Sequence, residues 1–297
     1  MGYLFLFVAL FAGATKGFCG KKTSGFVTAY KAAAFTNFIR MMFCIIIGFI
    51  LLVAEGNVRL IAIDTKTLFI TALSGITTSV FVVTWLLSVR KGAYMMLDVF
   101  IMLGIIVPIA LSFMLFNEAI TLKQIIGIAV LFVAVIIMCS YNNQVKEKMS
   151  ISSLILLIIC GVSNGLTDFS QKLFIKSNPD GSIAVFSFYT YIFSAAVLLL
   201  VYLFAKSNHE GNQSANSALK SILIYVVIMS VCLFANSYFM TKAAIYLPSA
   251  QLYPLSRGAS LILSSVMSAL FFKEKLTSRC ITGIVISFIG LIIINVL

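Results

Sequence analysis

The segment FNEAITLKQIIG (residues 116–127) recurs later in the chain as FKEKLTSRCITG (residues 272–283). Phe, Glu, Thr and Gly return in it at a constant offset of 156 residues. A second correspondence, at an offset of 151 residues, relates Phe18 and Lys21 to Phe169 and Lys172. The two halves of the chain therefore resemble each other, as the products of a tandem duplication do.

The sequence around these motifs is strongly apolar. Of its 297 residues, 61% are hydrophobic and 10% are charged, and the mean hydropathy is +1.11. Soluble domains have about 25% charged residues, and a helix needs roughly 20 apolar residues to cross a bilayer. The pattern disfavours a soluble enzyme with an unusually apolar core. It predicts an all-α integral membrane protein of about ten transmembrane helices, at residues 3–20, 35–53, 67–89, 93–116, 122–141, 153–174, 183–204, 219–241, 248–272 and 278–296.

The polar loop 142–152 divides the predicted spans into two sets of five. Because five is odd, the second set must insert upside down relative to the first. The chain is thus predicted to be a 5+5 inverted repeat, with a first five-helix repeat at 1–141 and a second at 153–297. Inverted repeats around a midplane site are typical of secondary transporters.

The positive charge of the chain fits a membrane protein. The net charge is +12, and the basic residues lie mostly in short loops between spans, as the positive-inside bias predicts. Basic blocks interleaved with aromatic residues are absent from the sequence, so no nucleic-acid partner is predicted. The six cysteines are scattered singly and the one histidine, His209, lies in a polar loop, so neither a metal site nor a cofactor is predicted.

The duplicated Phe-x-Glu-x-x-Thr-x-x-x-x-x-Gly pattern resembles that of the EamA-like drug/metabolite transporter superfamily, as does the run 244–251 that leads into the ninth span. The resemblance covers the chain as two tandem EamA domains. It implies a ten-helix fold, alternating access, and a central cavity lined by the first four and the sixth to ninth helices. The first half departs from exact symmetry, with Asp98 where the second half has Pro254.

The resemblance and the charge bias disagree on orientation. We call the side reached by loops after odd-numbered spans the odd face, and the side that carries the other loops and both termini the even face. The odd face has 12 Lys and Arg residues and the even face has 6, which predicts a cytoplasmic odd face. The superfamily implies cytoplasmic termini, so the orientation stays open.

Several recurring residues have structural interpretations. Glu118 and Glu274 precede predicted helices, where a carboxylate satisfies free N–H groups, and this capping role is favoured over transport chemistry. Thr121 and Thr277 are predicted caps at the same places, and Thr121 with Gln124 fits a capping box. The small-residue pairs Gly13/Gly17 and Gly161/Gly165 predict close helix packing, and Pro108 and Pro254 predict kinks.

Five charged residues fall within predicted spans, where each needs a partner or water. Lys16, Arg40 and Asp98 lie near the odd face. Asp168 and Arg257 lie on the even-face side of the membrane, at a somewhat greater depth from that face. We therefore predict a Lys16–Asp98 pair and an Asp168–Arg257 pair. The pairs are either gate latches that break during transport or permanent charge neutralisation, and the sequence does not decide between them.

Between these charges lies a belt of uncharged polar and aromatic residues. It contains Trp85 and Tyr94 nearer the odd face, and otherwise Thr77, Thr78, Ser79, Asn236, Tyr238, Gln251, Ser260 and Ser264. Such a cavity suits a small polar or amphipathic metabolite, for example an amino acid-like compound or a drug. The belt and the charged residues are the predicted substrate cavity or gate.

The predicted function is that of a secondary transporter in the cell membrane, working by alternating access in the direction of export. Its partners would be a small-molecule substrate and the lipid bilayer, with protons as a candidate coupling ion and a homodimer left open. A non-transporting membrane scaffold or sensor is the alternative. A membrane-embedded enzyme is disfavoured, because the spans contain no HExxH, no GxSxG and no histidine.

Overall fold

A computed structural model describes residues 1–25, 30–56, 64–90, 94–139, 151–205, 211–272 and 278–295. These residues form eleven helical segments and no strand. The segments are α1 (Gly2–Ser24), α2 (Tyr30–Ala54), α3 (Thr65–Arg90), α4 (Tyr94–Leu103), α5 (Ile106–Phe116), α6 (Leu122–Cys139), α7 (Ile151–Ser177), α8 (Ile183–Phe204), α9 (Gly211–Tyr246), α10 (Ser249–Phe272) and α11 (Ser278–Asn295).

The ten predicted spans all fall on these helices, which confirms the all-α fold. The span predicted at 93–116 is not one continuous helix. It consists of α4 and α5, which are separated by a turn at Gly104 and Ile105. The cause is Pro108, which cannot donate to the carbonyl four residues earlier and whose ring clashes with it. That carbonyl belongs to Gly104, and it accepts instead from the N–H of Val107, at 3.1 Å. By contrast, α10 continues through Pro254 without a break.

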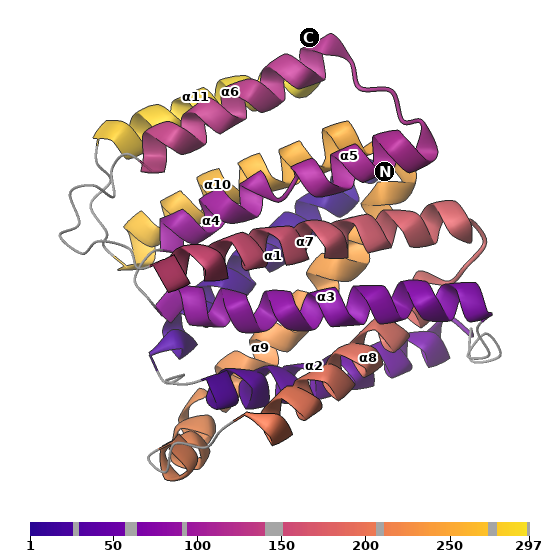
Figure 1. Ribbon diagram of the computed structural model, residues 1–297, viewed down its shortest axis with the longest axis vertical. Helices are drawn as coiled ribbons and strands as arrows, with labels where there is room; N and C mark the ends of the chain where they lie inside the picture. Colours follow the sequence, from indigo (N-terminus) through magenta and orange to yellow (C-terminus); the bar gives the residue numbers. More distant parts are fainter. Residues whose placement is uncertain are drawn as a thin grey trace.

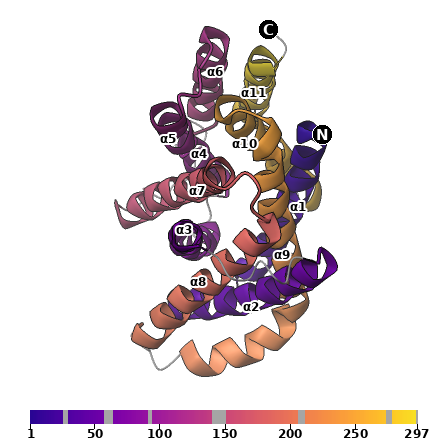
Figure 2. The ribbon, with the colours of Figure 1, turned by 90° about the vertical axis from the view of Figure 1, so that its right-hand side faces the viewer.

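The helices run side by side, and most neighbours come from opposite halves of the chain (Figures 1 and 2). The main pairs are α1 with α9, α3 with α7, α2 with α8 and α6 with α11. If each span is replaced by the one five spans away, α1–α9 becomes α7–α3, and the other two pairs map onto themselves. The packing therefore has the internal exchange symmetry expected of two intertwined five-helix repeats.

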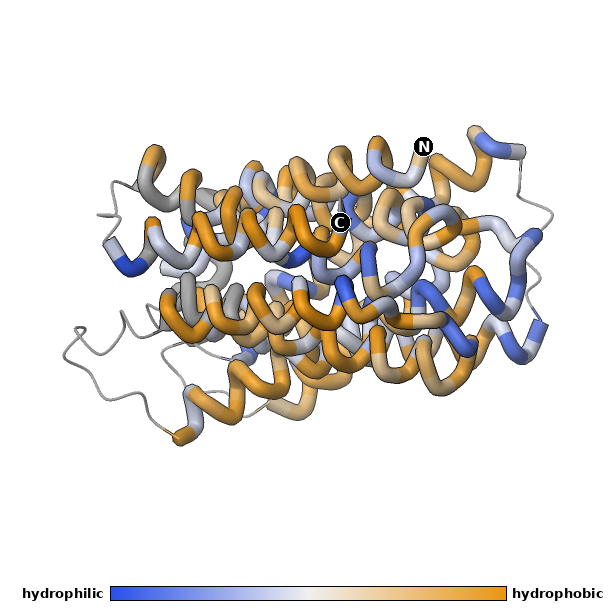
Figure 3. Tube along the Cα trace, turned by 90° about the horizontal axis from the view of Figure 1, so that it is seen from above, coloured by the Kyte–Doolittle hydropathy of each residue, from blue (hydrophilic) through white to orange (hydrophobic). Residues whose placement is uncertain are grey.

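The outer surface is suited to lipid. Six of the described helices are long and apolar enough to cross a membrane, and three shorter apolar stretches accompany them at 100–116, 122–134 and 281–294. Large apolar side chains such as Phe11, Phe69 and Leu270 are 64%, 71% and 69% exposed. Figure 3 shows apolar residues along most of the helix lengths. Such continuous exposed apolar surface marks a membrane-facing exterior.

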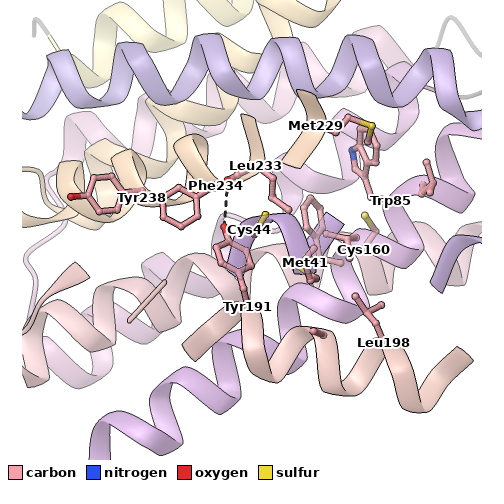
Figure 4. Close-up of a cluster of buried hydrophobic side chains, with 14 of the residues drawn as sticks. Met41, Cys44, Trp85, Cys160, Tyr191, Leu198, Met229, Leu233, Phe234 and Tyr238 are labelled. Carbon is pink, nitrogen blue, oxygen red and sulfur yellow. Dashed lines mark hydrogen bonds between the residues drawn. The ribbon is translucent and has the colours of Figure 1, made fainter. Parts of the chain in front are cut away.

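The largest buried cluster joins α2, α3, α8 and α9 across the two halves. In Figure 4 Tyr191 of α8 points toward α9, where its hydroxyl donates to the carbonyl of Leu233 at 3.5 Å. Cys44 of α2 packs beside them, and its thiol donates to the carbonyl of Ser230 at 3.4 Å. The Tyr191 hydroxyl and the Cys44 thiol thus find backbone carbonyls as acceptors inside the protein.

The broken span crosses α7 at glycines, as the small-residue spacing predicts. A Cβ built on Gly161 would lie 2.2 Å from the carbonyl oxygen of Phe100, and one on Gly165 would lie 2.3 Å from that of Gly104. Real side chains do not fit into such gaps. The absence of side chains at both glycines is what lets α4 and α5 approach the α7 backbone.

We expect Gly161→Ala to lower the melting temperature of the detergent-solubilised protein, because overpacking at this crossing costs about 1–3 kcal/mol. Gly25→Ala is the matched control, since Gly25 has a φ of −63° and a Cβ there meets no atom within 4 Å. Equal melting temperatures for the two variants would contradict this account of the crossing.

Candidate substrate cavity

A cavity of about 70 Å³ lies between helices of both halves. This is room for a few water molecules or a small ligand group. Its wall comes from α1, α3, α4, α9 and α10 and comprises Gly13, Ala14, Lys16, Gly17, Phe81, Trp85, Ile101, Asn236, Arg257, Ser260, Leu261 and Ser264. Of the residues predicted for the belt and the charged groups, six line this cavity, namely Lys16, Trp85, Asn236, Arg257, Ser260 and Ser264.

One wall of the cavity is aromatic. Phe81 and Trp85 are four residues apart on α3 and therefore lie on the same helix face. The Lys16 ammonium of α1 lies 5.7 Å from the centre of the Phe81 ring. Trp85 packs against Gly20, where a Cβ would stand 2.2 Å from the indole. The glycine thus makes the space that positions the indole beside Lys16.

The predicted Asp168–Arg257 pair is present. Arg257 of α10 donates to the Asp168 carboxylate of α7, which also accepts from the Asn164 amide at 3.3 Å. The Tyr253 hydroxyl donates to the Asp168 carbonyl at 2.8 Å, which joins the same two helices a second time. The Asp168 side chain is only 6% exposed, so this ion pair is buried. Whether it breaks during transport stays a prediction.

Asn236 holds α9 against α1 at the floor of the cavity. Its amide donates to the Ala9 carbonyl at 2.7 Å. Gly13, one turn further along α1, leaves room for this amide, since a Cβ there would lie 3.2 Å from the amide nitrogen. The first glycine of the predicted Gly13/Gly17 pair therefore accommodates a polar contact, and both glycines line the cavity.

On the even-face side, the space below the cavity is filled. The buried cluster there comprises Leu6, Ala9, Ile105, Ile109, Met240, Ala243, Ala244, Leu247, Leu252 and Tyr253. On each of the helices α1, α5, α9 and α10 these residues lie closer to the even face than the cavity residues of the same span do. The cavity is thus closed toward the even face by packed apolar side chains.

Glu118 seals the same side, but not in the predicted way. Its carboxylate does not cap the helix that follows it, α6. It accepts from the backbone N–H of Ser249 at 2.9 Å, which is the first residue of α10 in the other half. Its second oxygen lies 3.0 Å from the Lys172 ammonium and 3.6 Å from that of Lys176. Glu118 therefore caps a helix as predicted, but the capped helix is α10 and not α6.

Lys172 completes this network at the even face. Its ammonium donates to the carbonyls of Ala244 and Leu247 at the end of α9, at 3.1 and 3.0 Å. A cation is favourable there because the last carbonyls of a helix carry partial negative charge. One buried Lys–Glu pair thus satisfies the end of α9 and the start of α10.

The Thr121 capping box is confirmed. The Thr121 N–H donates to the Gln124 side chain at 3.0 Å, and the Gln124 N–H donates to the Thr121 hydroxyl at 3.3 Å. The corresponding caps of the second half, Glu274 and Thr277, lie outside the described residues. Their role stays a prediction.

Other predicted site residues lie away from the cavity. Arg40 is buried in α2, where it donates to the Asn37 side chain at 2.6 Å, and Thr78 is buried in α3 but does not line the cavity. Tyr238 donates to Glu55 at 2.7 Å, and Gln251 donates to the Tyr3 hydroxyl at 2.7 Å. Of these four, Tyr238 and Gln251 bond to residues of other segments, Arg40 bonds within α2, and Thr78 is buried. Their part in a substrate pathway or gate stays a prediction.

Two further predicted residues, Tyr94 and Asp98, have side chains outside the described part of the chain. The Lys16–Asp98 pair therefore stays a prediction.

Phe81 was not among the predicted site residues, and no contact was predicted for Lys172. Phe81 could have been found because it stands one helical turn from Trp85 on the same face. Lys172 is the counterpart of Lys21 in the second repeat. This correspondence does not indicate that Lys172 contacts the end of α9. Ile101 and Leu261 carry no signal that distinguishes them from lipid-facing apolar residues.

The packing and the cavity define a multi-pass helical membrane protein. Residues 151–296 match the model of the EamA-like transporter family. This match falls on the predicted second repeat and confirms the resemblance seen in the sequence. The fold is thus that of an all-α membrane protein of the EamA type, a family of drug and metabolite transporters.

The likeness extends to solved structures. A crystal structure of another protein, 13% identical in sequence, superposes with a TM-score of 0.75 and covers 99% of this chain and 96% of that chain. At this identity the likeness shows the fold. Among curated proteins no match is found.

Glu118→Gln is expected to destabilise the folded protein by about 1–3 kcal/mol at neutral pH, because it removes a charged hydrogen-bond partner. Burial alone would raise the pKa of Glu118, but the hydrogen bonds from Ser249 and the Lys172 charge outweigh it, so its pKa lies below 4.5. The stabilisation by this carboxylate is therefore fully present above pH 4.5 and is lost as the pH falls through its folded-state pKa. Melting temperatures measured from pH 7 downward should fall less steeply for the variant, and parallel curves would count against the network.

Arg257→Met should be strongly destabilising, by about 3–5 kcal/mol, because it leaves the Asp168 carboxylate buried without its cation. Replacing both residues, with Asp168→Leu added, should recover much of the loss. Thermal unfolding of the two single variants and the double variant forms a double-mutant cycle that measures the coupling. Additive effects would show that the two side chains do not stabilise each other.

Proposed function

We propose that this protein is a secondary transporter of the cell membrane that exports a small polar or amphipathic metabolite by alternating access. The observation that carries the proposal is the cavity between helices of both halves, which contains charged and polar side chains and is closed toward the even face. A polar space of this kind in a lipid-embedded protein is costly unless it serves a solute. The family match to EamA-like transporters supports the same function.

The exchange symmetry of the helix pairs supports alternating access. In this structure α1 and α9 close the even side, and their repeat counterparts are α7 and α3. A rocking motion of one set against the other would open the even side and close the odd side around the same cavity. On this proposal the Asp168–Arg257 pair and the Glu118–Lys172 network are the even-face contacts that must loosen when the cavity opens there.

A reconstituted transport assay tests the proposal. Purified protein in proteoliposomes should accumulate or release at least one labelled compound from a panel of amino acids, nucleosides, organic acids and amphipathic drugs. A pH dye in the lumen shows whether protons move with the solute. Transport of no compound above protein-free vesicles would favour a scaffold or sensor.

A cavity-filling variant provides the structural control. Ser260→Phe places a ring in the cavity and should abolish transport, because the solute and the ring cannot share the space. Val285→Phe adds the same ring at a position of α11 that is 53% exposed, and transport should persist. Uptake by the Ser260→Phe protein at the wild-type rate would show that the cavity is not on the solute pathway.

A further inference from the structure

The charges around the cavity do not balance. Lys16 interacts electrostatically with two other cations, Arg40 and Arg257, and with one carboxylate, that of Asp168. Arg40 lies away from the cavity, and the described wall of the cavity itself contains two cations, Lys16 and Arg257, and no carboxylate. Unmatched positive charge inside a membrane is costly, and a bound anion would relieve it.

The carboxylate that could attract a cationic ligand is already engaged. Arg257 and the Asn164 amide both donate to Asp168, and its side chain is buried. Lys16, in contrast, lines the cavity and has no carboxylate within salt-bridge distance among the described residues. Its one described direct partner is the Phe81 ring. The ammonium is therefore the cavity group best placed to meet a negatively charged ligand.

A second donor at the cavity lacks a partner. The Nε atom of Arg257 is buried and has no hydrogen-bond acceptor in the described structure, although the same guanidinium bonds to Asp168. Buried N–H groups without an acceptor are rare and call for an explanation. The Nε atom of Arg40, away from the cavity, is unpartnered in the same way, so this atom alone does not specify a ligand.

The rest of the wall suggests the shape of the ligand. Phe81 and Trp85 provide flat apolar surface beside Lys16, and Ile101 and Leu261 add aliphatic surface. Ser260 and Ser264 provide hydroxyl groups on α10. The chemistry of this wall suits a molecule with one charged end and one apolar, preferably planar, part, and because about 70 Å³ holds only a small group, the cavity must widen to admit it.

We propose that the cavity selects a small organic anion, with Lys16 as the counter-ion of its carboxylate and the Phe81–Trp85 wall as the seat of its apolar part. This inference rests on the proposed transport function and specifies the substrate class. It disfavours both a cationic drug, which would meet the excess positive charge, and a zwitterion, whose ammonium would have no free carboxylate among the described wall residues.

Trp85 allows binding to be measured without transport. It is the only tryptophan in the chain, and it lines the cavity, so the indole fluorescence of the protein reports on that site. Three probes share a phenyl ring on a two-carbon chain and differ in charge: 3-phenylpropionate is an anion, phenylalanine a zwitterion and phenethylamine a cation. Each is titrated into the detergent-solubilised full-length protein.

The anion should bind at least about tenfold more tightly than the other two probes, the size of one charge-assisted hydrogen bond. Lys16→Gln should weaken anion binding by about tenfold or more, Lys16→Arg should retain it, and Lys16→Glu should shift the preference to phenethylamine. Lys242→Gln is the matched control, because that lysine also lies over aromatic rings, at 4.6 Å from Tyr238, but outside the cavity. Elution profiles and melting temperatures confirm that each variant is folded.

The proposal is overturned if phenylalanine or phenethylamine binds as tightly as the anion, or if none of the probes alters Trp85 fluorescence at millimolar concentration. Unchanged anion affinity in a folded Lys16→Gln protein overturns the role of Lys16. These results are separate from the transport assay. Anion binding without transport would reject the proposed transport function and keep the anion site. Transport of cations or zwitterions without anion binding would reject the anion site and keep the transport function.

Discussion

The absence of water from the hydrocarbon core is the constraint on which the rest of this structure depends. Every buried N–H, C=O and charged group must find its partner within the protein. Helices solve this for the backbone, so the remaining problems are helix ends, helix breaks and the few charges. Lys172 and Glu118 satisfy the end of α9 and the start of α10, and Arg257 satisfies Asp168. The polar contacts that position the cavity helices therefore also satisfy the buried charges and helix ends, which lipid cannot do.

Features that depend on composition and depth could be predicted from the sequence. The helices follow from long apolar runs, because no other structure buries that many apolar residues in a bilayer. The Asp168–Arg257 contact followed from two opposite charges on the even-face side of the sixth and ninth spans. Depth does not specify which side of a helix faces inward, however. Tyr238 and Gln251 were predicted at the cavity from their depth, yet their side chains bond to Glu55 and to Tyr3.

Features that depend on how the halves meet could not be predicted. Glu118 has a local capping pattern, and only the arrangement of the two repeats brings the start of α10 within 2.9 Å of it. The break in the fourth span was expected at Pro108, where the covalent cause lies. Its effect appears four residues earlier, because the missing N–H would have paired with Gly104. In both cases the sequence motif identifies a cause, and the three-dimensional packing decides where the effect falls.

The crossing of the fourth span with α7 has a mechanical consequence. At Gly104, Gly161 and Gly165 two backbones touch without side chains that interlock, and one of them is already broken at that point. Interdigitated side chains resist rotation, whereas smooth backbone surfaces in contact resist it little. The crossing therefore has few side chains that would oppose rotation of one helix against the other. If alternating access operates as proposed above, α4 would turn about this crossing on the odd-face side, and α5 would stay with the packed even-face side.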